Sequence, residues 1–400
     1  MRRFFRRLCA LLTPLCLAAQ AGIGFYAHAL PSSYVVAAGD RLSLPAPVTA
    51  QGARTASAGA VEYDATLRLF GVFPVKHISV HEASDMEVVL GGTVFGMKLY
   101  TSGVLVVGLT DVDTAGGSAH PAADAGVQKG DVIESIDGQA VSTKGEVAAL
   151  VEQSAGRPMT LQVRRDGVTF PVRFAATRSV GEGRYKAGLW VRDSSAGIGT
   201  MSFYLPSSGV FAGLGHPICD VDTGEMLPIS GGEIVPARIY SITRGVGGDA
   251  GELCGGFDGG CCGNLLVNDR NGVYGVAAQL PPDGEVVAVA PRQEVTVGAA
   301  KLRCTLDDSG PAWYDIEIRR VRYSGGEQDM DIVVTDPTLL SRTGGIVQGM
   351  SGSPIVQNGK LVGAVTHVLV NDPACGYAIF ADTMLEEARG TAAQTTRKAA

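Results

Sequence analysis

The chain has 400 residues and a net charge of −7, and 46% of its residues are hydrophobic while 18% are charged. This length fits two or three domains, and the apolar share argues against global disorder. The acidic balance disfavours broad electrostatic binding to nucleic acid. Glycine accounts for 54 residues, nearly double the usual share of about 7%, which indicates many turns between short strands.

The N-terminus has the pattern of a targeting segment. Four arginines stand between positions 2 and 7, and an apolar stretch follows at 8–19. Two Ala-x-Ala cleavage signals come next, at 19–21 and 27–29. The pattern predicts export, with residues 1–30 serving as a signal peptide or, if uncut, as a membrane anchor.

Residues 31–71 are rich in Ala, Ser and Gly, which predicts a linker or stalk with some local strand. Between 72 and 178 the pattern changes to that of a small mixed domain. We expect a strand at 104–107, a short helix at 122–126 and a strand over 130–138 that ends in an Asp-Gly turn. An amphipathic helix at 143–153 and a closing strand at 159–163 complete the domain.

One segment of this domain resembles a PDZ domain: Ala122-x-x-Ala125-Gly126-Val127-x-x-Gly130-Asp131-x-Ile133-x-x-Ile136-Asp137-Gly138. PDZ domains bind C-terminal or extended peptides by adding a strand to a sheet edge. The resemblance implies a peptide-binding loop at Gly96, Met97, Lys98 and Leu99, which departs from the usual G-L-G-F type. A domain that clamps its own chain is the alternative.

From 179 to about 390 the sequence is rich in short strands and turns. Strands are expected at 234–236, 239–242, 272–276 and 316–318, and no long alternation of strands and helices appears. About 200 residues of this kind suit two packed β-barrels. The predicted fold is therefore mostly β, with a PDZ domain followed by a chymotrypsin-like double barrel and a tail at 391–400.

The segment Gly349-Met350-Ser351-Gly352-Ser353-Pro354 has the G-x-S-G-x-P pattern of chymotrypsin-like peptidases. Glycines on both sides of Ser351 expose its hydroxyl at a tight turn, so we predict that it is the nucleophile. The N–H groups of Gly349 and Ser351 can form an oxyanion hole. A hairpin through Asn358-Gly359 is expected next, which excludes the strand-to-helix elbow of G-x-S-x-G hydrolases.

A serine nucleophile needs a base, and only His216 and His367 follow residue 178. His216 lies 135 positions before Ser351, which places it in the other barrel and predicts a cleft between the two. His367 is predicted to line or support the pocket for the substrate residue before the scissile bond. A core histidine bonded to Asn371 or Asp372 is the alternative.

The third member of a triad is a carboxylate that fixes the tautomer of the imidazole. Asp336 follows an apolar strand and precedes Pro337, which favours it for this role. Chemistry alone leaves other candidates open, because a carboxylate close to its histidine in sequence can equally form a turn. These candidates are Asp220, Asp222 and Asp269.

Together these features resemble the SpoIVB peptidase family of endospore-forming bacteria. The strings that carry the likeness are Gly-Leu-Gly-His-Pro-Ile-x-Asp-x-x-Thr-Gly around His216, Gly-Met-Ser-Gly-Ser-Pro-Ile around Ser351, and 363–373 around His367. The resemblance implies a serine peptidase exported across the forespore membrane. It also implies cleavage of itself and of a membrane regulator of an intramembrane metalloprotease, which activates a sigma factor. It assigns the triad to His216, Asp336 and Ser351.

Two further interpretations compete with this one. An HtrA-like quality-control protease also joins a PDZ domain to such a barrel pair, but there the protease usually comes first. A non-enzymatic PDZ adaptor is opposed by the joint presence of a serine, a histidine and a carboxylate. No cofactor is expected. Six cysteines outside the targeting segment permit disulfides, and the lack of a C-x-x-C pair disfavours zinc; they are Cys219, Cys254, Cys261, Cys262, Cys304 and Cys375.

Overall fold

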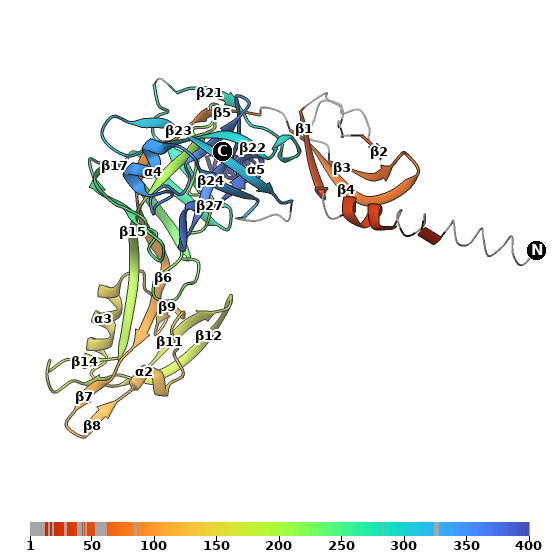
Figure 1. Ribbon diagram of the computed structural model, residues 1–400. Helices are drawn as coiled ribbons and strands as arrows, with labels where there is room; N and C mark the ends of the chain where they lie inside the picture. Colours follow the sequence, from red (N-terminus) through yellow and green to blue (C-terminus); the bar gives the residue numbers. More distant parts are fainter. Residues whose placement is uncertain are drawn as a thin grey trace, which may run out of the picture.

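The computed structural model describes residues 86–399 apart from 283 and 324–327, and before them 62–83, 46–52, 30–37, 20–27 and the single positions 13, 14, 17, 42 and 44. Most of the predicted targeting segment lies outside these residues. Strands dominate the described chain, as predicted. Figure 1 shows three parts: an N-terminal sheet, a large β body, and a small domain joined to the body by two long strands.

The N-terminal part is a four-stranded sheet with the order β1-β4-β3-β2. Its strands are β1 (Ser33–Ala37), β2 (Val48–Gln51), β3 (Glu62–Leu69) and β4 (Phe73–Ala83). Ala65, Leu67 and Leu69 alternate along β3 and are buried against Val80 of β4. The linker predicted for 31–71 is therefore wrong for these strands, because period-two alternation gives them a core of their own.

The first barrel closes through six strands in the order β6-β17-β19-β20-β16-β15, with β15 pairing back to β6. Phe95, Met97 and Leu265 are among the side chains that fill it. The predicted strands at 234–236 and 239–242 are one continuous strand, β17. The six are β6 (Val94–Leu109), β15 (Leu189–Tyr204), β16 (Val210–Gly213), β17 (Ile229–Thr243), β19 (Gly263–Asp269) and β20 (Gly272–Ala277).

Short strands flank this barrel: β5 (Glu87–Leu90), β18 (Glu252–Phe257) and β21 (Val286–Ala288). The second barrel is closed in the order β22-β23-β24-β27-β26-β25. Its strands are β22 (Gly298–Thr305), β23 (Pro311–Val321), β24 (Met330–Val334), β25 (Pro354–Gln357), β26 (Lys360–Leu369) and β27 (Asp372–Phe380). The predicted hairpin is confirmed, since Asn358 and Gly359 turn between β25 and β26 with φ of 52° and 78°.

Helices are few in this body. A 3-10 turn, η1 (Arg292–Glu294), precedes the second barrel, and α4 (Pro337–Thr343) follows β24. The chain ends in α5 (Ala381–Ala399), with Met384, Leu385 and Ala388 buried. The tail predicted at 391–400 is therefore wrong in its described part, because the helix continues through it.

The small domain between β6 and β15 contains the elements predicted for a PDZ domain. Helix α3 begins at Thr143, whose hydroxyl and the Glu146 carboxylate form a capping box. The elements are β7 (Val112–Thr114), β8 (Gly117–Ala119), α2 (Pro121–Asp124), β9 (Val132–Ile136), β10 (Gln139–Ala140), α3 (Lys144–Gln153), β11 (Pro158–Arg165), β12 (Val168–Ala175), β13 (Thr177–Arg178) and β14 (Tyr185–Lys186).

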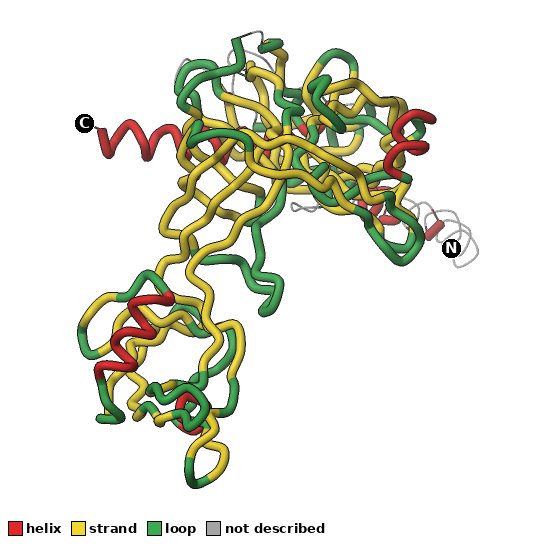
Figure 2. The backbone as a smooth tube through the Cα atoms, turned by 90° about the vertical axis from the view of Figure 1, so that its left-hand side faces the viewer, coloured by secondary structure: helices red, strands yellow, loops and turns green. Residues whose placement is uncertain are grey.

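This domain is an insertion into the first barrel rather than a domain in front of it. Strands β6 and β15 both run from the barrel into the PDZ domain (Figures 1 and 2) and pair along almost their whole length. The boundaries predicted at 72–178 and 179–390 are therefore wrong. Residues 73–83 belong to the N-terminal sheet, and 94–101 belong to the barrel.

The peptide-binding loop predicted at Gly96, Met97, Lys98 and Leu99 is also wrong. These residues lie within β6, where they pair with 195–198 of β15 on one side and with 232–235 of β17 on the other. Met97 and Leu99 point into the barrel core. A strand with partners on both edges has no free main-chain groups for a peptide.

Candidate active site

Ser351 stands at a tight turn between α4 and β25. The N–H of Gly352 donates to the Val365 carbonyl at 2.8 Å, and the N–H of Ser353 donates to the Met350 carbonyl at 2.9 Å. Gly352 has φ of 92°, and a Cβ there would lie 2.0 Å from the Thr200 carbonyl oxygen, so only glycine fits. The turn leaves Ser351 half-buried and buries Ser353 completely, which excludes Ser353 as a nucleophile.

The first barrel holds this turn in place through β15. The Thr200 N–H donates to the Ser351 carbonyl at 2.9 Å. The Thr200 hydroxyl donates to the Gly349 carbonyl at 2.8 Å, and the Ser202 hydroxyl donates to the Gly352 carbonyl at 2.7 Å. Sequence reasoning missed both residues. Two small hydroxyl side chains two positions apart in the Gly-rich and apolar second half of β15 were the available signal.

The geometry of the turn also leaves two amide groups available. Among the described residues, the N–H groups of Gly349 and Ser351 donate to no acceptor, while the intervening Met350 N–H donates to the Val347 carbonyl at 3.1 Å. Donors of this kind, fixed in one turn, can receive the negative charge of a tetrahedral intermediate. The predicted oxyanion hole is thus compatible with the structure.

His216 follows β16 at the end of the first barrel. Its Nδ1 lies 2.8 Å from the Pro217 carbonyl oxygen, and because a carbonyl can only accept, this bond places the proton on Nδ1 and a lone pair on Nε2. Burial lowers the pKa of His216 to about 4; the bond to Pro217 opposes this effect and the charge of His367 adds to it. The imidazole is therefore neutral near pH 7, as a base must be.

His367, on β26, lies against this imidazole with ring centroids 4.7 Å apart. It lines the same cleft as His216 and Ser351. The pocket role predicted for His367 stays a prediction. The Ser351 hydroxyl donates to the Thr366 carbonyl at 2.8 Å, so its proton must leave this bond before it can be donated to His216. Catalytic hydrogen bonds often form only once substrate is bound.

The cleft that these residues share has a volume of about 440 Å³ and lies between the two barrels. Its lining includes 195–198 of β15, the segment 346–349 and 366–368 of β26. The segment 217–219 closes one end. The strand main chain that β15 and β26 contribute to the lining suits an extended polypeptide.

Asp336 does not reach this cleft, and its predicted place beside His216 is wrong. It is the N-cap of α4, where its carboxylate accepts from the N–H groups of Thr338 at 2.8 Å and Leu339 at 3.0 Å. The Asp315 N–H adds a third bond at 3.3 Å. Helix capping of this kind occupies a carboxylate locally. No carboxylate of the described residues bonds to His216.

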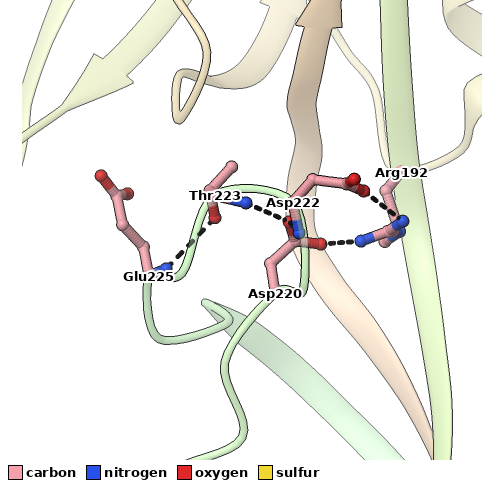
Figure 3. A network of polar contacts seen from close by, with 5 residues as sticks. All are labelled: Arg192, Asp220, Asp222, Thr223 and Glu225. Carbon is pink, nitrogen blue, oxygen red and sulfur yellow. Dashed lines mark hydrogen bonds and ion pairs between the residues drawn. The ribbon is translucent and has the colours of Figure 1, made fainter.

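Asp220 and Asp222 bind Arg192 of β15 instead (Figure 3). Asp220 is 2% exposed, and it also accepts from the N–H groups of Asp222 at 3.0 Å and Thr223 at 2.9 Å. Burial raises the pKa of Asp220, but the bonds from Thr223 and Arg192 outweigh it and hold the pKa below its usual value. This network fixes the loop after His216 to β15.

The remaining competitor, Asp269, accepts from the Asn271 N–H at 3.2 Å at the end of β19. None of the six described cysteines forms a disulfide. In the described part of the chain, no three metal-binding side chains gather into a possible ion site. The same residues contain no helix that combines the length and the apolar character needed to cross a bilayer.

Two barrels with a serine turn on one and a histidine on the other, and a PDZ domain inserted into the first, define a serine endopeptidase of chymotrypsin-like fold. The family model described as SpoIVB peptidase S55 matches residues 183–385, and a PDZ domain model matches 112–165. The chain belongs to the SpoIVB peptidase S55 family. A search of the curated proteins finds no match.

Three solved structures share parts of the fold at low identity. The HtrA-type protease AlgW with decapeptide is 12% identical, over 50% of this chain and 53% of its own, with a TM-score of 0.30. The chain thus spans about half of that protease. The inactive form of the Rv3671c protease is 14% identical over 47% of this chain and 81% of its own, with a TM-score of 0.26. The PDZ domain of the SdrC-like protein from Listeria monocytogenes is 19% identical over 22% of this chain and 87% of its own, with a TM-score of 0.19.

Proposed function

We propose that Ser351 is the nucleophile of this endopeptidase and His216 its general base. The observation that carries the proposal is that both line one cleft from different barrels, and that the Pro217 carbonyl leaves Nε2 of His216 unprotonated. The N–H groups of Gly349 and Ser351 are the oxyanion donors. The substrate is a polypeptide that enters the cleft in an extended form.

In the proposed reaction, Oγ of Ser351 attacks the substrate carbonyl carbon while Nε2 of His216 accepts the hydroxyl proton. The oxyanion is held by the two amide donors of the turn. His216 then protonates the leaving amine, and water attacks the ester with His216 again as base. Pro217 supplies the orientation that a carboxylate gives in a triad, but a carbonyl carries no full charge to stabilise the imidazolium.

A slow enzyme follows from this arrangement. Replacement of the aspartate in a Ser-His-Asp triad by an amide lowers kcat about 10⁴-fold, and part of that loss reflects the wrong tautomer. Here the tautomer is correct, so we expect a turnover intermediate between that of an intact triad and that of the amide variant. Such a rate suits a regulatory peptidase that cuts a few bonds rather than a digestive one.

The test uses the full chain, a fluorophosphonate probe and self-cleavage over time. Ser351→Ala is expected to lose labelling and self-cleavage. Ser353→Ala is the matched control, since this neighbouring serine is fully buried, and it is expected to retain both. Equal labelling and fragmentation of Ser351→Ala and the unchanged protein would contradict the proposal.

For the biological role, we propose an exported signalling peptidase. It would cleave itself and a membrane-bound regulatory protein that restrains an intramembrane metalloprotease, which leads to activation of a sigma factor during sporulation. The family membership and the basic, apolar N-terminal sequence support this proposal. The N-terminal segment would be removed as a signal peptide or retained as an anchor.

Two experiments test this role. Residues 1–45 fused to alkaline phosphatase, which folds only outside the cytoplasm, should give active phosphatase. In an endospore former that lacks its own family member, this chain should restore late sigma-dependent expression, and Ser351→Ala should not. An inactive fusion would contradict export, and restoration by Ser351→Ala would contradict a proteolytic role.

A further inference from the structure

Among the described residues, one edge of β15 has no partner strand along 189–198, and this edge links the PDZ domain to the active-site cleft. Along 189–200 it pairs with β6 alone; the pairings with β16 and β5 begin at Met201 and Phe203. No residue of 189–198 is buried, whereas each of 199–203 is. At one end of the edge lies the PDZ domain, and at the other 195–198 line the cleft with Ser351.

The main-chain groups of this edge are oriented to receive a strand. The Thr200 N–H donates to the Ser351 carbonyl at 2.9 Å, and the Thr200 carbonyl accepts from the Leu214 N–H at 3.4 Å. Both groups therefore point away from β6. Because main-chain orientation repeats every two residues and the pairing with β6 is regular over 194–200, the groups of Ile198 and Ala196 point the same way.

The PDZ end of the edge has a site that suits a chain terminus. Ala187 is 7% exposed and Gly188 is also buried, yet among the described residues their N–H groups donate to no acceptor. Main-chain donors in a folded domain normally have an acceptor, so two neighbouring N–H groups without a protein acceptor are available to a ligand. Gly188 has φ of 73°, and a Cβ there would lie 2.5 Å from the Thr110 carbonyl oxygen, so the turn requires glycine.

Helix α3 forms the outer wall beside this part of β15. The Lys144 N–H at its start donates to the Asp193 carboxylate at 2.9 Å, and the Glu152 carboxylate near its end accepts from the Tyr185 N–H at 2.7 Å. The helix is thus tied to β15 at one end and, at the other, to β14 just before β15 begins. A strand flanked by a helix, with free amide donors at its start, is the arrangement in which PDZ domains capture a C-terminal carboxylate.

Building on the proposed function, we propose that one polypeptide substrate occupies the whole edge. Its C-terminal carboxylate binds the amides of Ala187 and Gly188, and its chain runs antiparallel to β15 into the cleft. The segment on β15 is then the part that follows the scissile bond. Ten residues of β15, from Leu189 to Ile198, separate the two sites, which is about 33 Å of extended chain.

The consequence is a length rule for cleavage. The scissile bond would lie about ten residues before a free C-terminus, because the carboxylate site and Ser351 are held at a fixed separation by one strand. Side-chain preference at the cleft would act on top of this rule. The site replaces the peptide-binding loop that the sequence analysis expected at 96–99.

The experiment uses the full chain and a library of random 24-residue peptides, each with a free or an amidated C-terminus. Cut sites are mapped by mass spectrometry, and a fluorophosphonate probe measures Ser351 reactivity separately. With free termini, cuts should concentrate about ten residues from the end, and amidation should lower kcat/KM at that position about tenfold or more, because it removes the charge that the amides bind. Cuts spread evenly along peptides of both kinds would overturn the length rule.

A variant pair tests the strand edge itself. Ala196→Pro removes an N–H that points to the open edge and leaves the pairing with β6 intact, which is the position where a strand tolerates proline. In this variant, cuts should no longer concentrate about ten residues from a free C-terminus. Thr169→Ser on β12, which lies outside the edge and the cleft, should cut as the unchanged protein does. If circular dichroism shows that Ala196→Pro is unfolded, the same test can be made on the substrate, with an ester in place of the fourth amide after the scissile bond. Unaltered cleavage of this substrate would overturn the proposal.

The outcomes separate this inference from the proposed function. If the unchanged chain neither labels at Ser351 nor cuts any peptide, the proposed function fails. If it labels and cuts without regard to the C-terminus, the function stands and the inference fails.

Discussion

Replacement of Asp336 by asparagine distinguishes a helix cap from a catalytic carboxylate. Oδ1 of Asp336 accepts from the N–H groups of Thr338 and Leu339 at 2.8 and 3.0 Å, and an asparagine amide oxygen can accept the same two bonds. We therefore expect Asp336→Asn to keep the cap but to cost about 1 kcal/mol, because its Nδ2 cannot accept the bond from the Asp315 N–H. Asp336→Ala should cost about 1–2 kcal/mol, because it removes the N-cap as well.

In both variants, any loss of peptidase activity should be explained by the loss of folded protein alone. The kcat/KM of the folded fraction is expected to stay within about threefold of the unchanged protein, a difference of roughly 0.6 kcal/mol. Urea unfolding gives the folded fraction, and hydrolysis of a peptide cut by the unchanged enzyme gives kcat/KM. A triad aspartate behaves differently, since its amide variant loses about 10⁴-fold in kcat. A folded Asp336→Asn that loses more than about 10³-fold would refute the assignment of Asp336 as a cap.

Three further predictions concern the cleft and its support. The pKa of His216 is lowered to about 4, so kcat/KM should decrease on acidification with a midpoint near pH 4 rather than 6.5. His367→Gln should raise this midpoint, because it removes a neighbouring charge. A midpoint of 6.5 in both proteins would contradict this prediction. Arg192→Met removes the ion pair of Asp220 but leaves the bonds from the Asp222 and Thr223 N–H groups. It should therefore cost about 1–3 kcal/mol in urea unfolding, with partial recovery on adding Asp220→Asn; no recovery would contradict the pairing. Ser202→Ala should cost about 1–2 kcal/mol, since it removes a buried bond to the nucleophile turn, whereas an unchanged midpoint would show that the bond is not needed.

Local chemistry allowed much of this protein to be predicted from sequence. The strands, the capped helix of the PDZ domain and the Asn358-Gly359 hairpin depend on neighbouring residues, so their patterns were informative. The G-x-S-G-x-P string predicted the tight turn at Ser351 for the same reason, while the catalytic roles of Ser351 and its amide donors stay predictions. The two histidines were found because so few follow residue 178.

Other features depend on which segments far apart in sequence pair with each other, and the order of the residues along the chain does not predict these pairings. Strand β6 was assigned to the PDZ domain because its last residues do enter it, while its first residues close a barrel with β17. Asp336 has the strand-then-proline setting of a functional loop, but a helix N-cap has the same setting. The Pro217 carbonyl that orients His216 is a main-chain group, and no residue type signals it.

The insertion of the PDZ domain also constrains how the peptidase can fold. Closing the first barrel requires β6 to find β15 across the intervening 110–188, and an unfolded connection of that length makes such a closure entropically costly and slow. A folded PDZ domain brings the ends of β6 and β15 together and removes most of that cost. Thr200, which anchors the nucleophile turn, lies just beyond the insertion. Any lesion that unfolds the PDZ domain should therefore delay formation of the protease itself, so damage to this inserted domain would lower peptidase activity.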